Sequence, residues 1–228
     1  MTQQKIEEER VPFPRFPLQE TLAELDIAGT YVRANRPRDH IWASSLGACR
    51  KSVWTEWNHP RPHDDDFEQH RGALGHAVED IMAAKLKRVI VAREVSFTTP
   101  LISGRADFVV RLERGGPMIP VECKSTTAFD WSMKDPKRAH VLQTQFYVSQ
   151  TDAPFGILLY YNLANWGGQM GHWGTLYVPR DDAGLQSRAE LLWADVHGTD
   201  APACENPGEK NGCWDCNRAE GTLDEGGH

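Results

Sequence analysis

The sequence lacks a long hydrophobic run. No uninterrupted apolar stretch reaches about 18 residues, the length at which a segment becomes a candidate transmembrane helix. The first ten residues are mostly polar or charged and contain no apolar segment of the kind that directs secretion. We therefore expect no membrane span and a location in the cytoplasm.

The chain also lacks an excess of basic residues. Its 25 Lys and Arg residues face 32 Asp and Glu residues, which gives a net charge of −7. A protein that binds nucleic acid passively carries a broad basic surface against the phosphates. The acidic balance counts against such a binder but leaves room for an enzyme built around a carboxylate cluster.

The sequence of 228 residues contains no internal repeat and no low-complexity linker. A chain of this length can bury one sizeable core. Because the first residues are charged and punctuated by proline, we expect an N-terminal arm over residues 1–40 and a single domain over residues 41–228.

A disulfide framework is not expected either, because the five cysteines are odd in number and no secretion signal precedes them. Cys213 and Cys216 form a C-x-x-C pair, which can hold a metal ion or cluster from a tight turn, and Cys204 lies shortly before them. Cys49 is the candidate fourth ligand once Cys123 is assigned to a strand. All-cysteine ligation suits zinc or an iron–sulfur cluster, and free reduced thiols are the alternative.

Hydrophobic periodicity predicts the elements of an α/β fold. Ser44 and Ser45 resemble an N-cap, so we expect a helix that starts there, ends before Pro60 and carries Cys49 in its first two turns. Downstream, the pattern predicts helices at 69–91, 137–150 and 180–197, and strands at 92–98, 105–112, 119–125, 155–163 and 172–178. This order places helices on the faces of a sheet.

Acidic side chains occur where two of these strands should be apolar. Glu122 and Lys124 are two residues apart, so both lie on one face of a strand, and Asp107 lies in the preceding strand. Charges in such places cost several kcal/mol unless they are paired or bind a metal. Incidental charges on two surface strands are the alternative, because a lone Glu-x-Lys is common.

The chemistry that fits this set is metal-assisted hydrolysis. Asp107, Glu122 and the backbone carbonyl of Cys123 can supply oxygen ligands to Mg²⁺, which keeps several waters. The cation lowers the pKa of a bound water, the nucleophile. Lys124 can orient that water, help to deprotonate it, or offset charge on the attacked phosphate.

The helix predicted at 69–91 adds a possible ligand. His76 and Glu79 are three residues apart and share one helix face. On the residues alone, His76 is as readily a surface histidine as a metal ligand. Glu79 can ligate a second metal, although an exposed carboxylate is the favoured interpretation.

Four motifs in order give these residues a family context. They are Gly72-Ala-Leu-Gly-His76, Gly104-Arg-Ala-Asp107, Glu122-Cys-Lys124 and Gln143-Thr-Gln-Phe-Tyr147. Together they resemble the RecB-type branch of the PD-(D/E)XK nuclease superfamily. The resemblance implies a restriction-endonuclease-like αβββαβ core, with a mixed central sheet flanked by helices. It further implies that His76, Asp107 and Glu122 bind the metal and that Lys124 is catalytic. Gln143 and Tyr147 would contact the DNA backbone or brace the lysine.

The cysteines resemble the iron–sulfur staple of the AddB nuclease domain and the CRISPR-associated Cas-four nucleases. One cysteine precedes the nuclease motifs and three follow them, as in those families. The resemblance implies a [4Fe–4S] cluster in preference to Zn²⁺, bound by Cys49, Cys204, Cys213 and Cys216, which docks the C-terminal tail on an N-terminal helix. One departure is that Cys204 precedes the C-x-x-C pair, whereas the families place their lone cysteine after it.

The expected function is accordingly that of a Mg²⁺- or Mn²⁺-dependent DNA exonuclease. By resemblance it would act on DNA ends or single strands in recombination, repair or replication, in a prokaryote or phage. No G-x-x-x-x-G-K-[ST] motif occurs, so any unwinding requires a helicase or recombination partner. The alternative is a non-catalytic nucleic-acid-binding or adaptor module with zinc in its cysteine site.

Overall fold

The computed structural model describes residues 39–60, 65–127, 129–163, 171–205, 213 and 216. The predicted N-terminal arm therefore lies almost wholly outside the described residues, and its assignment stays a prediction. None of the described helices is both long and apolar enough to cross a membrane.

The described elements follow the predicted order, with three short additions. They are β1 (Ile41–Trp42), η1 (Ala43–Ser45), α2 (Arg50–Asn58), α3 (Asp65–Leu86), β2 (Ile90–Thr98), β3 (Ile102–Val110), β4 (Ile119–Thr126), α4 (Phe129–Lys134), α5 (Arg138–Ser149), β5 (Phe155–Asn162), β6 (Trp173–Pro179) and α6 (Asp182–His197). The additions are β1, η1 and α4.

The prediction of where the first helix starts was wrong. Ser44 and Ser45 lie in the 3₁₀ turn η1, and the α-helix begins only at Arg50, with Cys49 as its N-cap. Between the two elements, Gly47 lies directly against the backbone of Ala139 in α5. Cys49 therefore lies at the N-terminus of α2 and not within its first two turns.

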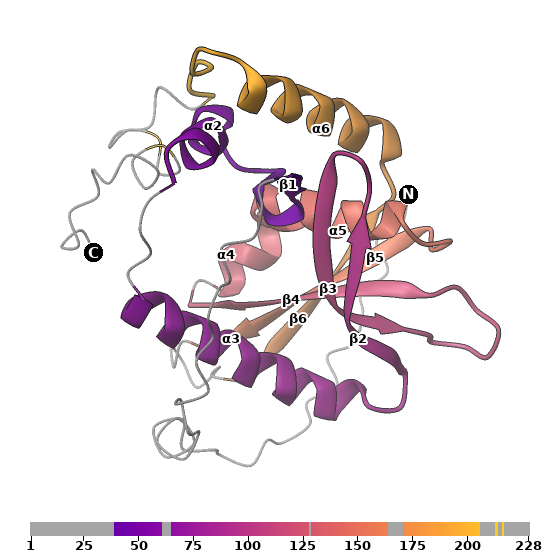
Figure 1. The fold of residues 1–228 in the computed structure, drawn as a ribbon. Helices are drawn as coiled ribbons and strands as arrows, with labels where there is room; N and C mark the ends of the chain where they lie inside the picture. Colours follow the sequence, from indigo (N-terminus) through magenta and orange to yellow (C-terminus); the bar gives the residue numbers. More distant parts are fainter. Residues whose placement is uncertain are drawn as a thin grey trace. The chain divides into compact units, whose positions relative to one another are not determined.

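The sheet is mixed, with strand order β1-β3-β4-β5-β6 and with β2 paired to β3 (Figure 1). The pairs β2–β3, β3–β4 and β5–β6 are antiparallel, whereas β1–β3 and β4–β5 are parallel. Parallel neighbours need a crossover connection. Between β4 and β5 that crossover contains α4 and α5.

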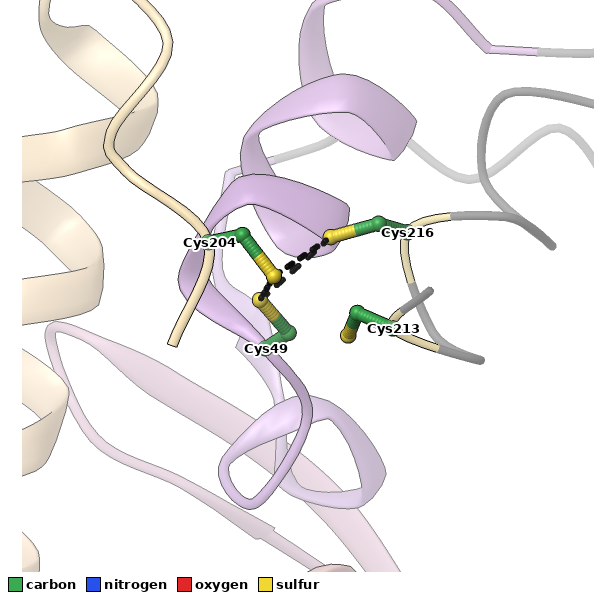
Figure 2. Close-up of side chains that lie close together, drawn as sticks. All are labelled: Cys49, Cys204, Cys213 and Cys216. Atoms are coloured by element: carbon green, nitrogen blue, oxygen red, sulfur yellow. Dashed lines mark hydrogen bonds between the residues drawn. The ribbon is translucent and has the colours of Figure 1, made fainter. Parts of the chain in front are cut away.

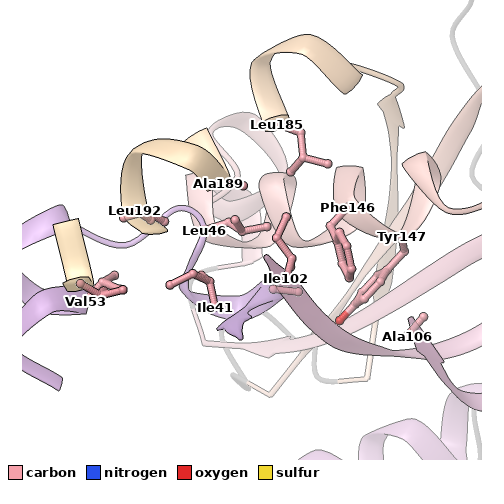
Figure 3. Packing of buried hydrophobic residues seen from close by; sticks show 12 residues of the cluster. Ile41, Leu46, Val53, Ile102, Ala106, Phe146, Tyr147, Leu185, Ala189 and Leu192 are labelled. Atoms are coloured by element: carbon pink, nitrogen blue, oxygen red, sulfur yellow. The ribbon is translucent and has the colours of Figure 1, made fainter. Parts of the chain in front are cut away.

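Apolar clusters fill both faces of the sheet, which confirms the predicted α/β architecture. One cluster joins α5 and α6 to the start of β3 and includes Leu46, Ile102, Phe146, Tyr147 and Leu192 (Figure 3). The other packs α3 on the opposite face and includes Val78, Met82, Phe108, Val121 and Leu159. The sheet is thereby held between α3 and the α5–α6 layer.

Candidate active site and cysteine cluster

The predicted carboxylates lie where two strands separate. Strands β3 and β4 share only three residue pairs, and the last of them joins Phe108 to Val121. Immediately beyond, Asp107 Oδ2 accepts a hydrogen bond of 2.6 Å from the backbone N–H of Cys123. The Asp107 side chain thus connects β3 to β4 just beyond their last backbone pair. This hydrogen bond brings the Asp107 carboxylate beside Glu122.

Glu122 is the most constrained group at this fork. Its side chain is 2% exposed, and its Oε1 accepts a hydrogen bond of 2.5 Å from Lys124 Nζ. Its Oε2 is buried and has no hydrogen-bond partner among the residues that the structure describes. A buried polar atom left in this state costs about 1–3 kcal/mol, and more when the group is charged. A bound cation would satisfy it, so these residues fit the divalent metal implied by the sequence.

Burial and like charge govern the protonation of the fork. Burial raises the pKa of Asp107 well above its ordinary value, Glu122 adds to the rise, and Lys124 opposes it. Burial likewise raises the pKa of Glu122 against the opposing charge of Lys124. For Lys124, burial lowers the pKa, but the two carboxylates outweigh burial and raise it. Lys124 is therefore an ammonium ion in this arrangement, suited to orienting a water or offsetting phosphate charge.

Helix α3 brings a second donor set to the fork. His76 Nδ1 lies 3.3 Å from Glu79 Oε2, and the ligand atoms of His76, Glu79 and Glu94 all lie within 4.8 Å of one another. The charge of Glu79 also raises the pKa values of Asp107 and Glu122, so Glu79 faces the fork. The structure therefore groups His76 with Glu79 and Glu94, where the sequence had grouped it with Asp107 and Glu122.

Glu94 is a candidate site residue that sequence reasoning missed. It lies in β2 between the pairs Arg93–Phe108 and Val95–Ala106, which places it opposite Asp107. Its φ of 51° is left-handed, an uncommon and costly conformation for a residue with a side chain. Arg105 forms an ion pair of 3.3 Å with it. The only signal in the sequence was a charged pair, Arg93-Glu94, inside a strand pattern.

Gln143 and Tyr147 brace the strand that carries Asp107. Gln143 Nε2 donates to the Tyr147 hydroxyl at 3.0 Å, and that hydroxyl donates to the backbone carbonyl of Arg105 at 2.9 Å. Both side chains are buried. They hold β3 in the stretch between its pairings with β1 and β4. Their burial favours bracing over contact with the DNA backbone, and what they brace is β3.

A histidine and a tyrosine flank Lys124 on the same side of the sheet. His140 Nδ1 lies 2.7 Å from the Tyr160 hydroxyl, and Tyr160 is the register partner of Lys124. Burial lowers the pKa of His140 to about 3, and the charges of Lys124 and Lys137 add to the effect. His140 is therefore neutral near neutral pH. No pattern in the sequence singled out either residue.

The four predicted cysteines meet in one cluster. Figure 2 shows Cys49, Cys204, Cys213 and Cys216 converging, and their sulfurs all lie within 4.8 Å of one another. The sulfur of Cys49 lies 3.8 Å from that of Cys204 and 3.5 Å from that of Cys216, and Cys204 and Cys216 are 3.6 Å apart. Cys123 is absent from the cluster, because its side chain is buried in the core that packs against α3.

The sulfur spacing bears on which metal fits. Four thiolates around one zinc ion, at about 2.3 Å each, are separated by about 3.8 Å. The three separations given above match this value. In a four-iron cluster each cysteine binds a different iron, which sets the sulfurs farther apart. These three separations are close to the spacing around a single tetrahedral ion, whereas a [4Fe–4S] cluster needs the sulfurs farther apart.

Neither family models nor curated proteins match the chain. Among solved structures, the chain is similar to a phage-related exonuclease from Haemophilus somnus 129PT, with 12% identity and a TM-score of 0.51 over 68% of this chain and 90% of that one. An alkaline exonuclease, LHK-Exo, from Laribacter hongkongensis is 13% identical, with a TM-score of 0.49 over 69% and 88%. The protein SSO0001 is 20% identical, with a TM-score of 0.48 over 77% and 84%. At such identities the first similarity shows a shared fold.

Proposed function

We propose that the chain is a Mg²⁺- or Mn²⁺-dependent deoxyribonuclease that hydrolyses phosphodiester bonds. The observation that carries the proposal is the buried Glu122 carboxylate, which has one oxygen on Lys124 and the other without a partner, beside the Asp107 carboxylate. Such an arrangement is costly for a merely structural site. It is expected of a site that binds a cation next to a fixed ammonium group.

The chain's own residues have distinct tasks in this reaction. Asp107, Glu122 and the Cys123 carbonyl would hold the cation, and His76 with its neighbours Glu79 and Glu94 would approach it from α3 and β2. When bound, a divalent cation lowers the pKa of water and offsets charge on phosphate. Lys124 orients the attacking water and stabilises negative charge that develops on the phosphate.

The substrate we propose is DNA with free ends or in single strands. The structurally similar protein from Haemophilus somnus 129PT is described as a phage-related exonuclease, and we propose the same mode, degradation from an end, for this chain. We place the activity in recombination, repair or replication, with a helicase or recombination partner for any unwinding. The protein would be of prokaryotic or phage origin and act in the cytoplasm.

The cysteine cluster would hold a structural metal that needs no redox step for hydrolysis. It ties the segment after α6 to the N-terminus of α2. The resemblance in sequence favours [4Fe–4S], whereas the sulfur separations favour Zn²⁺. We propose Zn²⁺ on the strength of the separations.

The test is digestion of end-labelled single- and double-stranded DNA with Mn²⁺ or Mg²⁺. Lys124→Ala and Asp107→Ala should each abolish the release of labelled nucleotides. Both variants should still unfold in a cooperative transition with a measurable midpoint. Lys87→Ala is the matched control, because Lys87 is an exposed lysine in the turn after α3. Cleavage that persists in both site variants would overturn the assignment. A wild type that binds DNA without cutting it would favour the adaptor alternative.

A further inference from the structure

A buried arginine joins the segments on either side of the cysteine cluster. Arg188 of α6 is 6% exposed, and its Nη1 and Nη2 donate to the two carboxylate oxygens of Glu205 at 2.7 and 2.9 Å. Its Nε also donates to the carbonyl of Leu46 at 2.9 Å, and its Nη2 to that of Ala48 at 2.6 Å. One guanidinium thus fixes the residue after Cys204 and the residues before Cys49.

Glu205 then contacts the cysteine site through both its side chain and its backbone. Its Oε2 accepts a hydrogen bond of 3.0 Å from the backbone N–H of Arg50, at the N-terminus of α2, where an anion is favoured. Its own backbone N–H donates to Cys49 Sγ at 3.4 Å. These bonds set the 3.8 Å separation between the sulfurs of Cys49 and Cys204.

The network continues through a second ion pair. Arg50 donates two hydrogen bonds of 2.6 Å to Asp195 of α6, so α2 is fixed to the helix that carries Arg188. Burying charged groups such as Arg188 costs several kcal/mol before pairing, and an apolar core of similar volume is often as stable. Bidentate arginine–carboxylate pairs offer defined geometry in return. Here these pairs hold the backbone beside Cys49 and Cys204, the two candidate metal ligands.

We propose that Arg188 and Glu205 are positioning residues of the cysteine metal site, which hold Cys49 and Cys204 at ligand spacing. The inference rests on the structural metal proposed above and is independent of the nuclease assignment. Outer-shell partners of metal ligands typically contribute about 10–100-fold to metal affinity. Loss of the pair should therefore weaken metal retention by about tenfold or more.

The test measures metal release from the full chain. Wild type, Arg188→Lys and Glu205→Gln are purified anaerobically, their metal content is determined by mass spectrometry, and transfer of the metal to a chromogenic chelator is followed over time. Both variants should release metal about tenfold faster than wild type. Glu205→Gln is nearly isosteric and partly exposed, so it remains informative if Arg188→Lys folds poorly.

The matched control is Arg180→Lys. Arg180 also bonds one carboxylate, that of Asp182, and two backbone carbonyls, those of Thr151 and Ser149, and none of these contacts is with a cysteine. A second readout separates positioning from general stabilisation: titration of metal-free protein with Co²⁺ should give a weaker thiolate charge-transfer band in Glu205→Gln, at a metal-free unfolding midpoint close to that of wild type. Release rates and Co²⁺ spectra equal to those of wild type, or equal acceleration in Arg180→Lys, would overturn the proposal. Retained metal in a protein that cuts no DNA would instead defeat the nuclease assignment alone.

Discussion

The contact between Gly47 and α5 gives a sharp prediction for Gly47→Ala. A Cβ at residue 47 would lie 2.3 Å from both Cα and N of Ala139, and 2.6 Å from the carbonyl carbon of Arg138. All three are backbone atoms, so no side-chain rotation can relieve the overlap. Reaching the ordinary contact range, which begins at 3.4 Å, requires the two segments to separate by about 1 Å.

Such a displacement should affect catalysis more than folding. Overpacking of this kind typically costs about 1–3 kcal/mol of stability. Helix α5 also carries Gln143 and Tyr147, whose hydroxyl bond holds β3 two residues before Asp107. A misplacement of about 1 Å in a catalytic arrangement can reduce the rate about 10²-fold. We therefore expect Gly47→Ala to fold, to unfold at a lower temperature, and to cleave DNA about 10²-fold more slowly.

Gly75→Ala is the control for this experiment. Gly75 lies in α3 directly before His76, and a Cβ there would meet nothing within 4 Å. Replacing a helical glycine by alanine typically stabilises by about 0.5–1 kcal/mol. The assay is Mn²⁺-dependent release of nucleotides from end-labelled DNA, together with thermal unfolding. If Gly47→Ala matched wild type in both rate and midpoint, or if the two glycine variants behaved alike, the reasoning about α5 would fail.

Three further predictions concern the metal, the pH dependence and the second donor set. Anaerobically purified protein should be colourless and contain about one zinc per chain, and brown, iron-containing protein would refute the argument from sulfur spacing. The pKa of His140 is about 3 in the folded protein, so near pH 6.5 this histidine binds a proton in the unfolded chain but not in the folded one. Stability should therefore fall as pH drops below about 6.5, by at most about 1.4 kcal/mol per pH unit from this group. His140→Gln should flatten that slope in urea titrations at two pH values, and an unchanged slope would count against it. Glu94→Gly should relieve the left-handed strain by about 1 kcal/mol yet raise the Mn²⁺ concentration needed for half-maximal cleavage; an unchanged Mn²⁺ requirement would remove Glu94 from the site.

The order of helices and strands could be predicted because periodicity is a local property. The helix predicted at 69–91 ends at Leu86 in the structure, because the chain turns there and β2 begins at Ile90. The predicted N-cap at Ser44 failed for a different reason. The break between η1 and α2 coincides with a tertiary contact, Gly47 against α5, and no local signal in the sequence reports such a contact.

The candidate site divides in the same way. Glu122 and Lys124 could be placed on one face because a strand has a period of two, and Asp107 could be placed beside them because β3 and β4 are neighbours. Glu94 depends on a local distortion of β2, and Arg188 depends on a partner in another segment. Neither a distorted strand residue nor a long-range ion pair has a sequence pattern of its own. Spacing predicted three members of the cysteine cluster and elimination with the family resemblance predicted Cys49, but nothing predicted the connection of the cluster to α6.

The cysteine cluster also has a consequence for the order in which the molecule is assembled during synthesis. Cys49 meets Cys204 and Cys216 across 155 and 167 positions of the chain. Closing a loop of this length costs about 5 kcal/mol of chain entropy, and such distant contacts form late. The six described strands and α6 all precede Cys204 in the sequence, so they are synthesised before three of the four cysteines. The segments that form the sheet and the carboxylate fork are therefore available first, and metal binding by all four cysteines would be the last step of assembly.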